Sequence, residues 1–201
     1  MRDHITGIVI HCNTPEYLLK AIETVRMHED IDIILIDGSA RNSNGWVVCK
    51  GLKSESVKVT QLGHNIGHGK GINMAMAMVT TKYALLFDSD IEMLAPCLSE
   101  MIALMDGKYG CGQIIHTDMN GCNSVTGIEY LHPHFALIDV EQFGKYHACV
   151  HHGAPMIKAM RELSGMGLLV DFPVPQYVKH HGRATVRTKP REFKSHQWDK
   201  I

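Results

Sequence analysis

The chain has 201 residues and a mass of 22.5 kDa, the normal size of one compact domain. Hydrophobic residues make up 45% of it and charged residues 20%, so the composition excludes a disordered or fibrous protein. The formal net charge of -1 excludes a protein that binds nucleic acid over its whole surface.

The first half of the chain alternates predicted strands and helices. Short apolar runs rich in β-branched residues predict buried strands at residues 5–11, 31–36, 57–62 and 83–87. Thr14 predicts the cap of a first helix, with Pro15 at its first position and Glu16 in its first turn. A second helix is predicted at 69–80. Strand, helix and strand in this order predict parallel pairs with right-handed crossovers.

Beyond residue 93 the predicted elements are mixed. Helices are predicted at 96–105 and 155–163, and extended segments at 111–115, 135–139, 168–172 and 176–178. The expected fold class is therefore α/β, a single compact domain whose mixed, mainly parallel sheet is flanked by helices.

The sequence contains no segment predicted to span a membrane and no cysteine pattern typical of an oxidising compartment. No apolar run approaches the roughly 18 residues that a membrane span needs, and residues 1–3 lead into a strand rather than a signal peptide. The six cysteines include no Cys-x-x-Cys pair, which predicts reduced thiols rather than a disulfide framework or a zinc knuckle. We expect a soluble, cytoplasmic protein with no membrane partner.

Polar residues follow the ends of four predicted strands: Cys12-Asn13-Thr14, Asp37-Gly38-Ser39, His64-Asn65 and Asp88-Ser89-Asp90. In open parallel sheets, ligands bind at the carboxyl ends of the strands. Two carboxylates one residue apart, Asp88 and Asp90, can hold one hard cation that binds pyrophosphate oxygens. A solvated turn is the alternative for an isolated Asp-x-Asp, but its position after the apolar run 83–87 favours a cation site.

Residues 63–73, GHNIGHGKGIN, are glycine-rich and lead into a predicted helix. Such a loop lets backbone amides approach a phosphate or a sugar, and Lys70 adds positive charge. The loop is neither a Walker loop nor a dinucleotide fingerprint, because the Gly-Lys-[Ser/Thr] sequence and the required glycine spacing are absent. The alternative is a helix-entry loop that uses its glycines for turning.

Four segments resemble, in order and spacing, the family 2 glycosyltransferases with the GT-A fold: IVIHCN at 8–13, IILIDGS at 33–39, NIG at 65–67 with Asn73 downstream, and LLFDSD at 85–90. The resemblance is good over residues 5–93 and looser beyond. It implies a nucleotide-sugar-binding half at about 1–93, an acceptor-side half at about 94–185 and a basic tail at 186–201.

The resemblance implies that Asn13 and Asp37 contact the nucleotide, with Asp37 the usual partner of a uracil-type ring. A UDP-type donor is therefore favoured. The segment 65–73 would pack over the nucleotide. The residues expected to bind the nucleotide sugar are Cys12, Asn13, Asp37, Asn65, Lys70, Asp88 and Ser89.

The resemblance further implies that Asp88 and Asp90 bind the cofactor, Mn²⁺ or Mg²⁺, through the donor diphosphate. The segment HHGRAT at 180–185 is similar to the late histidine of the family. We choose His180 as the third metal ligand, with His181 as the second choice. Asp90 is accordingly counted among the catalytic residues.

One feature of the family is missing. Inverting members usually carry an acidic pair before a late helix, and its aspartate deprotonates the acceptor hydroxyl, but residues 149–155 read CVHHGAP. Three alternatives remain open: a histidine base, for which we choose His152; a base among Asp118, Asp139 and Glu141; or a retaining enzyme that needs no base.

His132 and His134 precede the predicted strand 135–139, a place that in the family lies beside the donor sugar and the acceptor. A zinc site of their own would need three or four convergent ligands, and the sequence supplies no known spacing for them.

The resemblance implies a metal-dependent glycosyltransferase that moves a sugar from a nucleoside-diphosphate sugar to an acceptor hydroxyl. One alternative is a sugar-nucleotide nucleotidyltransferase, but the glycine-rich, basic signature expected after the first strand is absent. Another is a non-catalytic binding module, against which the Asp-x-Asp counts. The acceptor stays open between a modified DNA base, a protein and a glycan, because seven Lys or Arg residues at 179–201 leave a nucleic-acid partner open.

Overall fold

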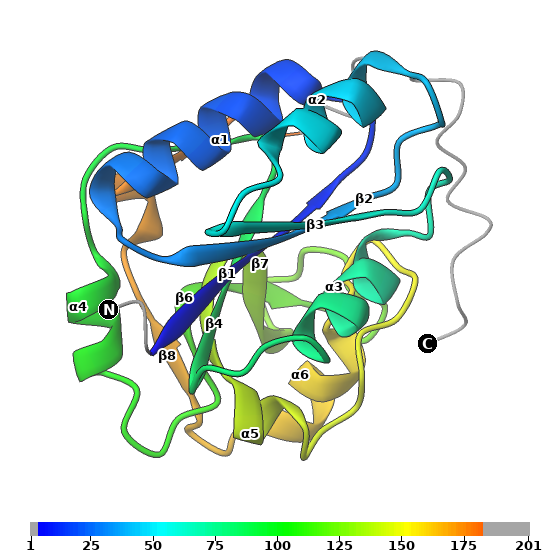
Figure 1. Cartoon of the computed structure of the whole chain (residues 1–201). Helices are drawn as coiled ribbons and strands as arrows, with labels where there is room; N and C mark the ends of the chain where they lie inside the picture. The colour runs from blue at the N-terminus through cyan, green and yellow to red at the C-terminus, as the bar shows by residue number, and fades with distance from the viewer. Residues whose placement is uncertain (1–3, 183–201) are drawn as a thin grey trace.

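A seven-stranded sheet forms the centre of the molecule in the computed structural model, which describes residues 4–182 (Figure 1). In spatial order its strands are β3 (Val57–Gln61), β2 (Asp32–Asp37), β1 (Ile5–His11), β4 (Tyr83–Asp88), β7 (Ile128–Asp139), β6 (Gly110–Thr117) and β8 (Leu169–Asp171). The strands from β3 to β4 are parallel, β7 is antiparallel to both of its neighbours, and β8 is parallel to β6. The expected α/β fold with a mixed, mainly parallel sheet is confirmed.

Strand β1 lies at the middle of the parallel part of the sheet. Ile8 on β1 pairs with Ile34 on β2 and with Leu86 on β4, and all three side chains are buried. The strands read as nearly continuous apolar runs because helices cover both faces of such a sheet. The chain extends to one side of β1 through β2 and β3 and to the other through β4. The carboxyl ends of β1 and β4 therefore flank the crevice where ligands of open α/β sheets bind.

The helices form a layer on each face of the sheet, as Figure 1 shows. One layer contains α1 (Pro15–His28), α2 (Asn44–Leu52) and α4 (Leu98–Ala103). The other contains α3 (His68–Met76), α5 (Val140–Phe143) and α6 (Ile157–Leu163). Each layer closes over its own cluster of buried apolar side chains, so the sheet has a hydrophobic core on both sides.

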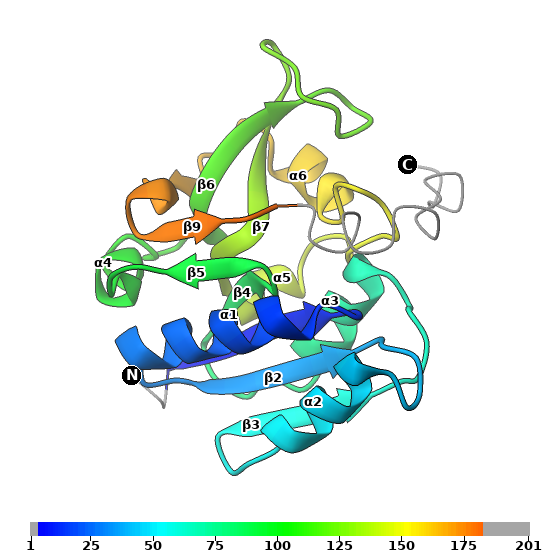
Figure 2. The same cartoon turned by 90° about the horizontal axis from the view of Figure 1, so that it is seen from above.

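A second, two-stranded sheet pairs β5 (Ile91–Met93) with β9 (Val178–His180), which follows the 3-10 helix η1 (Val174–Gln176). Figure 2 shows β5 and β9 side by side, with β5 packed over α1. The expectation of an extended segment at 176–178 is corrected, because Gln176 ends η1 and only Val178 enters a strand. Pro175 lies within the first turn of η1, where its fixed φ suits a helical turn.

Helix α2 is absent from the sequence prediction. Gly45 and Gly51 lower its helix propensity, so the segment reads as a loop. Two local features offset this cost. The Ser43 hydroxyl accepts a hydrogen bond from the N–H of Trp46 at 3.2 Å, and the Cys49 side chain is fully buried against the sheet.

Two further expectations need correction in detail. Strand β7 begins at Ile128 rather than at 135, because Pro133 and its polar neighbours conceal a strand that continues through them. Thr14 does precede the first helical residue of α1, but its side chain makes no capping hydrogen bond in the described part of the chain. The N–H of Thr14 is instead bound by the His11 ring at 3.0 Å.

Within residues 4–182, no helix is both long enough and apolar enough to cross a membrane. The predicted basic tail at 186–201 lies outside the described residues, as does the end of the segment 180–185.

A buried carboxylate joins two helices of the same layer. Glu29 follows the last residue of α1 and is 2% exposed. Its Oε1 atom accepts hydrogen bonds from the N–H groups of Cys97 and Leu98, at 2.8 and 3.0 Å, where α4 begins. These two N–H groups have no partner inside their own helix, so Glu29 fulfils the role of a helix cap from a distant part of the chain.

We expect Glu29→Ala to lower the free energy of unfolding by about 2–4 kcal/mol, since each buried N–H left without a partner costs about 1–3 kcal/mol. Glu29→Gln keeps an accepting oxygen and should lose less. The measurement is urea unfolding followed by circular dichroism. Glu23→Ala, at an exposed position of α1, is the control and should change stability by less than about 0.5 kcal/mol. Equal stabilities for the Glu29 and Glu23 variants would contradict this role.

Candidate active site at the strand ends

Two carboxylates and a histidine meet where β4 ends. Asp88 is the last residue of β4, and Asp90 precedes β5. The pairing of β5 with β9 places His180 opposite Ile91, and the N–H of His181 donates to the Asp90 carbonyl at 2.9 Å. The Nε2 atom of His180 consequently lies 3.2 Å from Asp90 Oδ1 and 3.4 Å from Asp88 Oδ2.

The three side chains form a compact set of hard ligands. One donor atom from each of Asp88, Asp90 and His180 lies within 4.8 Å of the other two. Carboxylate oxygens and an imidazole nitrogen suit Mg²⁺ or Mn²⁺. The geometry thus brings together the three residues expected to hold the metal, and their donor chemistry fits such an ion.

Electrostatic interactions among these residues shift the pKa values of His180 and Asp88 in opposite directions. Partial burial alone would lower the pKa of His180, but its contacts with Asp88 and Asp90 raise it to about 10. Burial alone would raise the pKa of Asp88, but the hydrogen bond from His180 and the charge of His68 hold it well below its usual range. A protonated His180 therefore lies between the Asp88 and Asp90 side chains at neutral pH.

Three more histidines surround this group. His68, the first residue of α3, places Nε2 3.6 Å from Asp88 Oδ1. His134 on β7 stacks on His180 with ring centroids 4.8 Å apart, and its Nδ1 lies 2.8 Å from Nδ1 of His132. Burial lowers the pKa of His134 to about 3 and also lowers that of His132, so both rings are neutral.

The sequence gives no prediction for His68, whereas the family resemblance places His132 and His134 beside the donor sugar and the acceptor without assigning them a role. A signal for the last two exists in the register of β7, which runs antiparallel to β4 and pairs Phe135 with Phe87. Residues just before Phe135 must then lie beside Asp88. Recognising this requires knowing that β7 is the neighbour of β4, which the sequence alone does not reveal.

Asp37 lies in the interior rather than at the open crevice. The residue is 0% exposed, and its Oδ1 accepts from the N–H of Ser39 at 2.9 Å and from His11 Nδ1 at 3.1 Å. Its Oδ2 accepts from Gln61 Nε2 at 3.0 Å. Burial alone would raise the pKa of Asp37, but these hydrogen bonds lower it to about 2. The carboxylate expected to meet a uracil-type ring is therefore fully engaged by protein donors.

Cys12 and Asn13 are half-buried and lie at the end of β1. Asn13 has a φ of 57°, in the left-handed region where asparagine is enriched. Its N–H donates to the Ser39 hydroxyl at 3.0 Å. These two residues thus form the exposed part of the turn at the switch point of the sheet, and Ser89 is a half-buried neighbour of Asp88.

The glycines of the 63–73 loop permit a close approach of protein backbone. A Cβ on Gly69 would lie 2.0 Å from the Val150 carbonyl oxygen. The Asn73 side chain donates to the Cys149 carbonyl at 2.8 Å and accepts from the Cys149 N–H at 2.9 Å. The first turn of α3 is thereby joined to the 149–151 segment.

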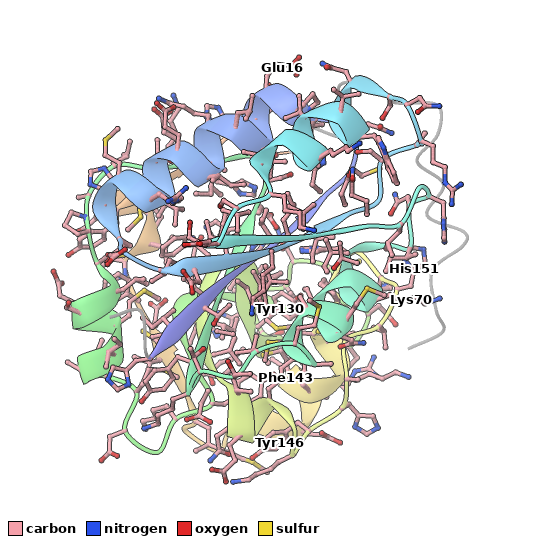
Figure 3. All side chains as sticks on the ribbon, in the orientation of Figure 1. Glu16, Lys70, Tyr130, Phe143, Tyr146 and His151 are labelled. Carbon is pink, nitrogen blue, oxygen red and sulfur yellow. The ribbon has the colours of Figure 1, made fainter. Side chains whose placement is uncertain are left out.

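Asn65 and Lys70 occupy the rim of this region. The exposed Asn65 accepts the N–H of Gly67 through Oδ1 at 2.8 Å. Lys70 is exposed, and Figure 3 labels it close to His151. Residues two apart on a helix do not share a face. In the first turn of α3, His68 therefore reaches Asp88, and Lys70 does not lie on the same face.

The residues considered as a catalytic base fall in different places. His152 accepts the N–H of Ala154 at its Nδ1 atom, at 3.0 Å. A neutral ring in that arrangement carries its proton on Nε2 and has no lone pair to offer, which counts against a role as general base.

The carboxylates considered for this role are also engaged. Asp118 Oδ1 accepts the N–H groups of Asn120 and Cys122 in the turn after β6. Asp139 pairs with Tyr83, at the opposite end of β4 from Asp88, about 17 Å away at the rise of a strand. Glu141, two residues after Asp139 in the sequence, is exposed and forms an ion pair with Lys145. Asp139 and Glu141 therefore lie outside the site.

His181 faces away from the two aspartates. Its Nε2 lies 3.7 Å from Glu92, and its ring meets Tyr17 edge-on at 5.6 Å. Consecutive residues of a strand point to opposite sides, so only His180 can reach Asp88 and Asp90.

The strand order, the crevice and the Asp-x-Asp at the end of β4 are those of a GT-A transferase. The model of the family described as "Glycosyl transferase family 2" matches residues 6–163. The chain therefore belongs to glycosyl transferase family 2.

Individual relatives are distant in sequence. The chain is 21% identical over 117 residues to a teichoic acid poly(glycerol phosphate) polymerase from Staphylococcus epidermidis, a match that covers 56% of this chain and 16% of that protein. The mannosyltransferase PcManGT from Pyrobaculum calidifontis, solved with GDP-Man and Mn²⁺, superposes with a TM-score of 0.67 at 12% identity, over 86% of this chain and 55% of that one.

The structure of S. aureus TarS 1-349 superposes with a TM-score of 0.57 at 14% identity, over 87% of this chain and 59% of that one. A second structure of TarS 1-349, in complex with UDP, gives a TM-score of 0.52 at 16% identity, over 71% of this chain and 48% of that one. These matches show the GT-A fold. The chain spans less than two thirds of the length of each relative.

We expect the His180 ring of the metal-free protein to titrate with a pKa of about 10. A pKa raised in the folded state means that stability from this contact is complete below pH 6.5 and lost as the pH rises through about 10. Ring signals followed by nuclear magnetic resonance from pH 5 to 11 measure it. Asp90→Asn removes one carboxylate and should lower the pKa. A wild-type His180 that titrates near 6.5 would contradict the bridge.

Proposed function

We propose that the protein transfers a sugar from a nucleoside-diphosphate sugar to an acceptor hydroxyl, with a divalent cation held by Asp88, Asp90 and His180. The observation that carries the proposal is the convergence of these three side chains at the switch-point crevice of the sheet. The cation, Mn²⁺ or Mg²⁺, would neutralise charge that develops on the departing diphosphate.

The surrounding residues have roles that follow from their placement. His68 approaches Asp88 from the α3 side, and the neutral His132 and His134 rings lie on the β7 side. A neutral ring can donate a hydrogen bond to a sugar hydroxyl without adding charge to the site. Cys12, Asn13 and Ser89 lie where the nucleotide and the diphosphate would enter.

In its specific form, the proposal assigns a UDP-type sugar donor and a Mn²⁺ or Mg²⁺ cofactor to the site. Support comes from the fold shared with a protein solved with UDP and with another solved with GDP-Man and Mn²⁺. The acceptor is a hydroxyl of a glycan, a protein or a modified base of DNA. With Asp139 and Glu141 outside the site, the alternatives for deprotonation of that hydroxyl are His152, Asp118 and a retaining reaction that needs no base.

The first test is a thermal-shift panel of UDP-, GDP-, CDP- and TDP-sugars, each with and without Mn²⁺. We expect a UDP-sugar to raise the melting temperature only when the metal is present, since a ligand at 100 times its Kd stabilises by about 2.7 kcal/mol. Asp90→Asn should abolish this rise. Asp106→Asn, at an exposed site in the loop after α4, is the matched control. A rise that persists in folded Asp90→Asn would refute the assigned metal site.

The second test concerns the base. A general base contributes about 10²–10⁴-fold to the rate, whereas the hydrogen bond from Ala154 leaves His152 without a free lone pair. We expect His152→Gln to change kcat by less than about tenfold and to leave its pH profile unaltered. A loss of 100-fold or more, with donor affinity retained, would instead establish His152 as the base.

A further inference from the structure

A buried histidine outside the metal site has a defined protonation pattern. His11 is 1% exposed and lies at the end of β1. Its Nε2 accepts the backbone N–H of Thr14 at 3.0 Å, so Nε2 carries no proton. The proton of the neutral ring is therefore on Nδ1, which faces Asp37 Oδ1 at 3.1 Å.

The same cluster invites a metal interpretation, which the geometry rejects. His11, Asp37 and Cys49 offer donor atoms within 4.8 Å of one another, and all three residues are buried. A metal on Nδ1 would require the proton on Nε2, where it would oppose the Thr14 N–H. Burial and the charge of Asp37 also raise the pKa of the Cys49 thiol above its usual range, which disfavours the thiolate form. The cluster is a hydrogen-bond network.

This network determines the shape of the turn after β1. The His11 ring holds the N–H of Thr14, and the His11 carbonyl accepts the N–H of Gly38 at 2.8 Å. Asp37 holds the N–H of Ser39, whose hydroxyl in turn accepts the N–H of Asn13 at 3.0 Å. Asn13 is thereby fixed in its left-handed conformation from both sides.

Close packing leaves no room for the turn to relax. A Cβ on Gly45 of α2 would lie 2.6 Å from the Ser39 hydroxyl, 3.1 Å from the His11 ring and 3.2 Å from the Asn13 Cα. In this turn Cys12 and Asn13 are half-buried, whereas His11 and Thr14 are buried. A ligand bound at this turn would contact a backbone whose geometry is held by the buried hydrogen bonds of His11, Asp37 and Ser39.

We infer that His11, oriented by Asp37, is a positioning residue that holds the Cys12–Asn13 turn in the shape that binds the nucleotide of the donor. The nucleotide part of this inference rests on the proposed function, whereas the hydrogen-bond part does not.

The hydrogen-bond part is tested on the metal-free protein without any substrate. Long-range ¹H–¹⁵N correlation spectra distinguish the two neutral tautomers of a histidine ring. We expect His11 to show the Nδ1–H form, and to keep it when Zn²⁺ is added. An Nε2–H form, or loss of the His11 signals on addition of one equivalent of Zn²⁺ while the other buried rings are unchanged, would overturn the assignment.

The positioning part is tested with His11→Asn, which retains an amide donor for Asp37 but removes the acceptor for the Thr14 N–H. We expect the KM for the donor, and the Kd of UDP with Mn²⁺, to rise by about tenfold, which corresponds to about 1.4 kcal/mol. The kcat should stay within about threefold, because the reacting groups at Asp88 and Asp90 are untouched. His4→Asn, exposed at the opposite end of β1, is the control.

A second variant guards against misfolding. Ser39→Ala removes the acceptor of the Asn13 N–H with little change of volume, and it should raise the same KM and Kd in the same direction. Unchanged nucleotide affinity in folded Ser39→Ala and His11→Asn would overturn the positioning role while the proposed function stands. A wild-type protein that binds no nucleotide with Mn²⁺ would overturn the proposed function and the nucleotide part together.

Discussion

The arrangement of the crevice depends on one buried carboxylate, Asp37 at the end of β2. Moving an ionised carboxylate out of water costs several kcal/mol unless charge-assisted hydrogen bonds replace the lost solvation. Here the donors come from His11 on β1, Ser39 after β2 and Gln61 on β3, and Gln61 also donates to the Trp46 carbonyl on α2 at 2.8 Å. Hydrogen bonds to the Asp37 carboxylate thus connect the ends of β1, β2 and β3, and Gln61 extends the network to α2. The polar segments after these parallel strands meet at one edge of the sheet.

The proposed metal site follows a different principle, in which like charges are balanced by a removable proton. Asp88 and Asp90 repel one another, and the protonated His180 offsets this repulsion in the metal-free state. His134 stacks on that charged ring but stays neutral itself, so the positive charge is confined to the position between the carboxylates. A divalent cation that replaced the proton would increase the positive charge at the same place, and binding of metal would release a proton.

The sequence predicts the α/β architecture, the four parallel strands and the Asp-x-Asp, because buried strands leave continuous apolar runs and their ends leave polar clusters. It also identifies His180, through a motif. It does not predict α2, whose glycines are compensated by the Ser43 cap and by packing, and it assigns no role to His134, whose contact with His180 depends on the antiparallel pairing of β7 with β4. The resemblance predicts that Asp37 contacts the nucleotide, but no local pattern predicts that His11 and Gln61 also surround it.

The contact between α3 and the 149–151 segment carries a consequence for the position of His68. The Asn73 side chain grips both backbone groups of Cys149, and Gly69 admits the Val150 carbonyl to a distance that no side chain would allow. Helix α3, which carries His68, is therefore joined to the 149–150 segment through main-chain contacts. A change of backbone in the 149–150 segment would therefore also shift the helix that places His68 beside Asp88. The 149–150 segment is constrained by its contacts with α3.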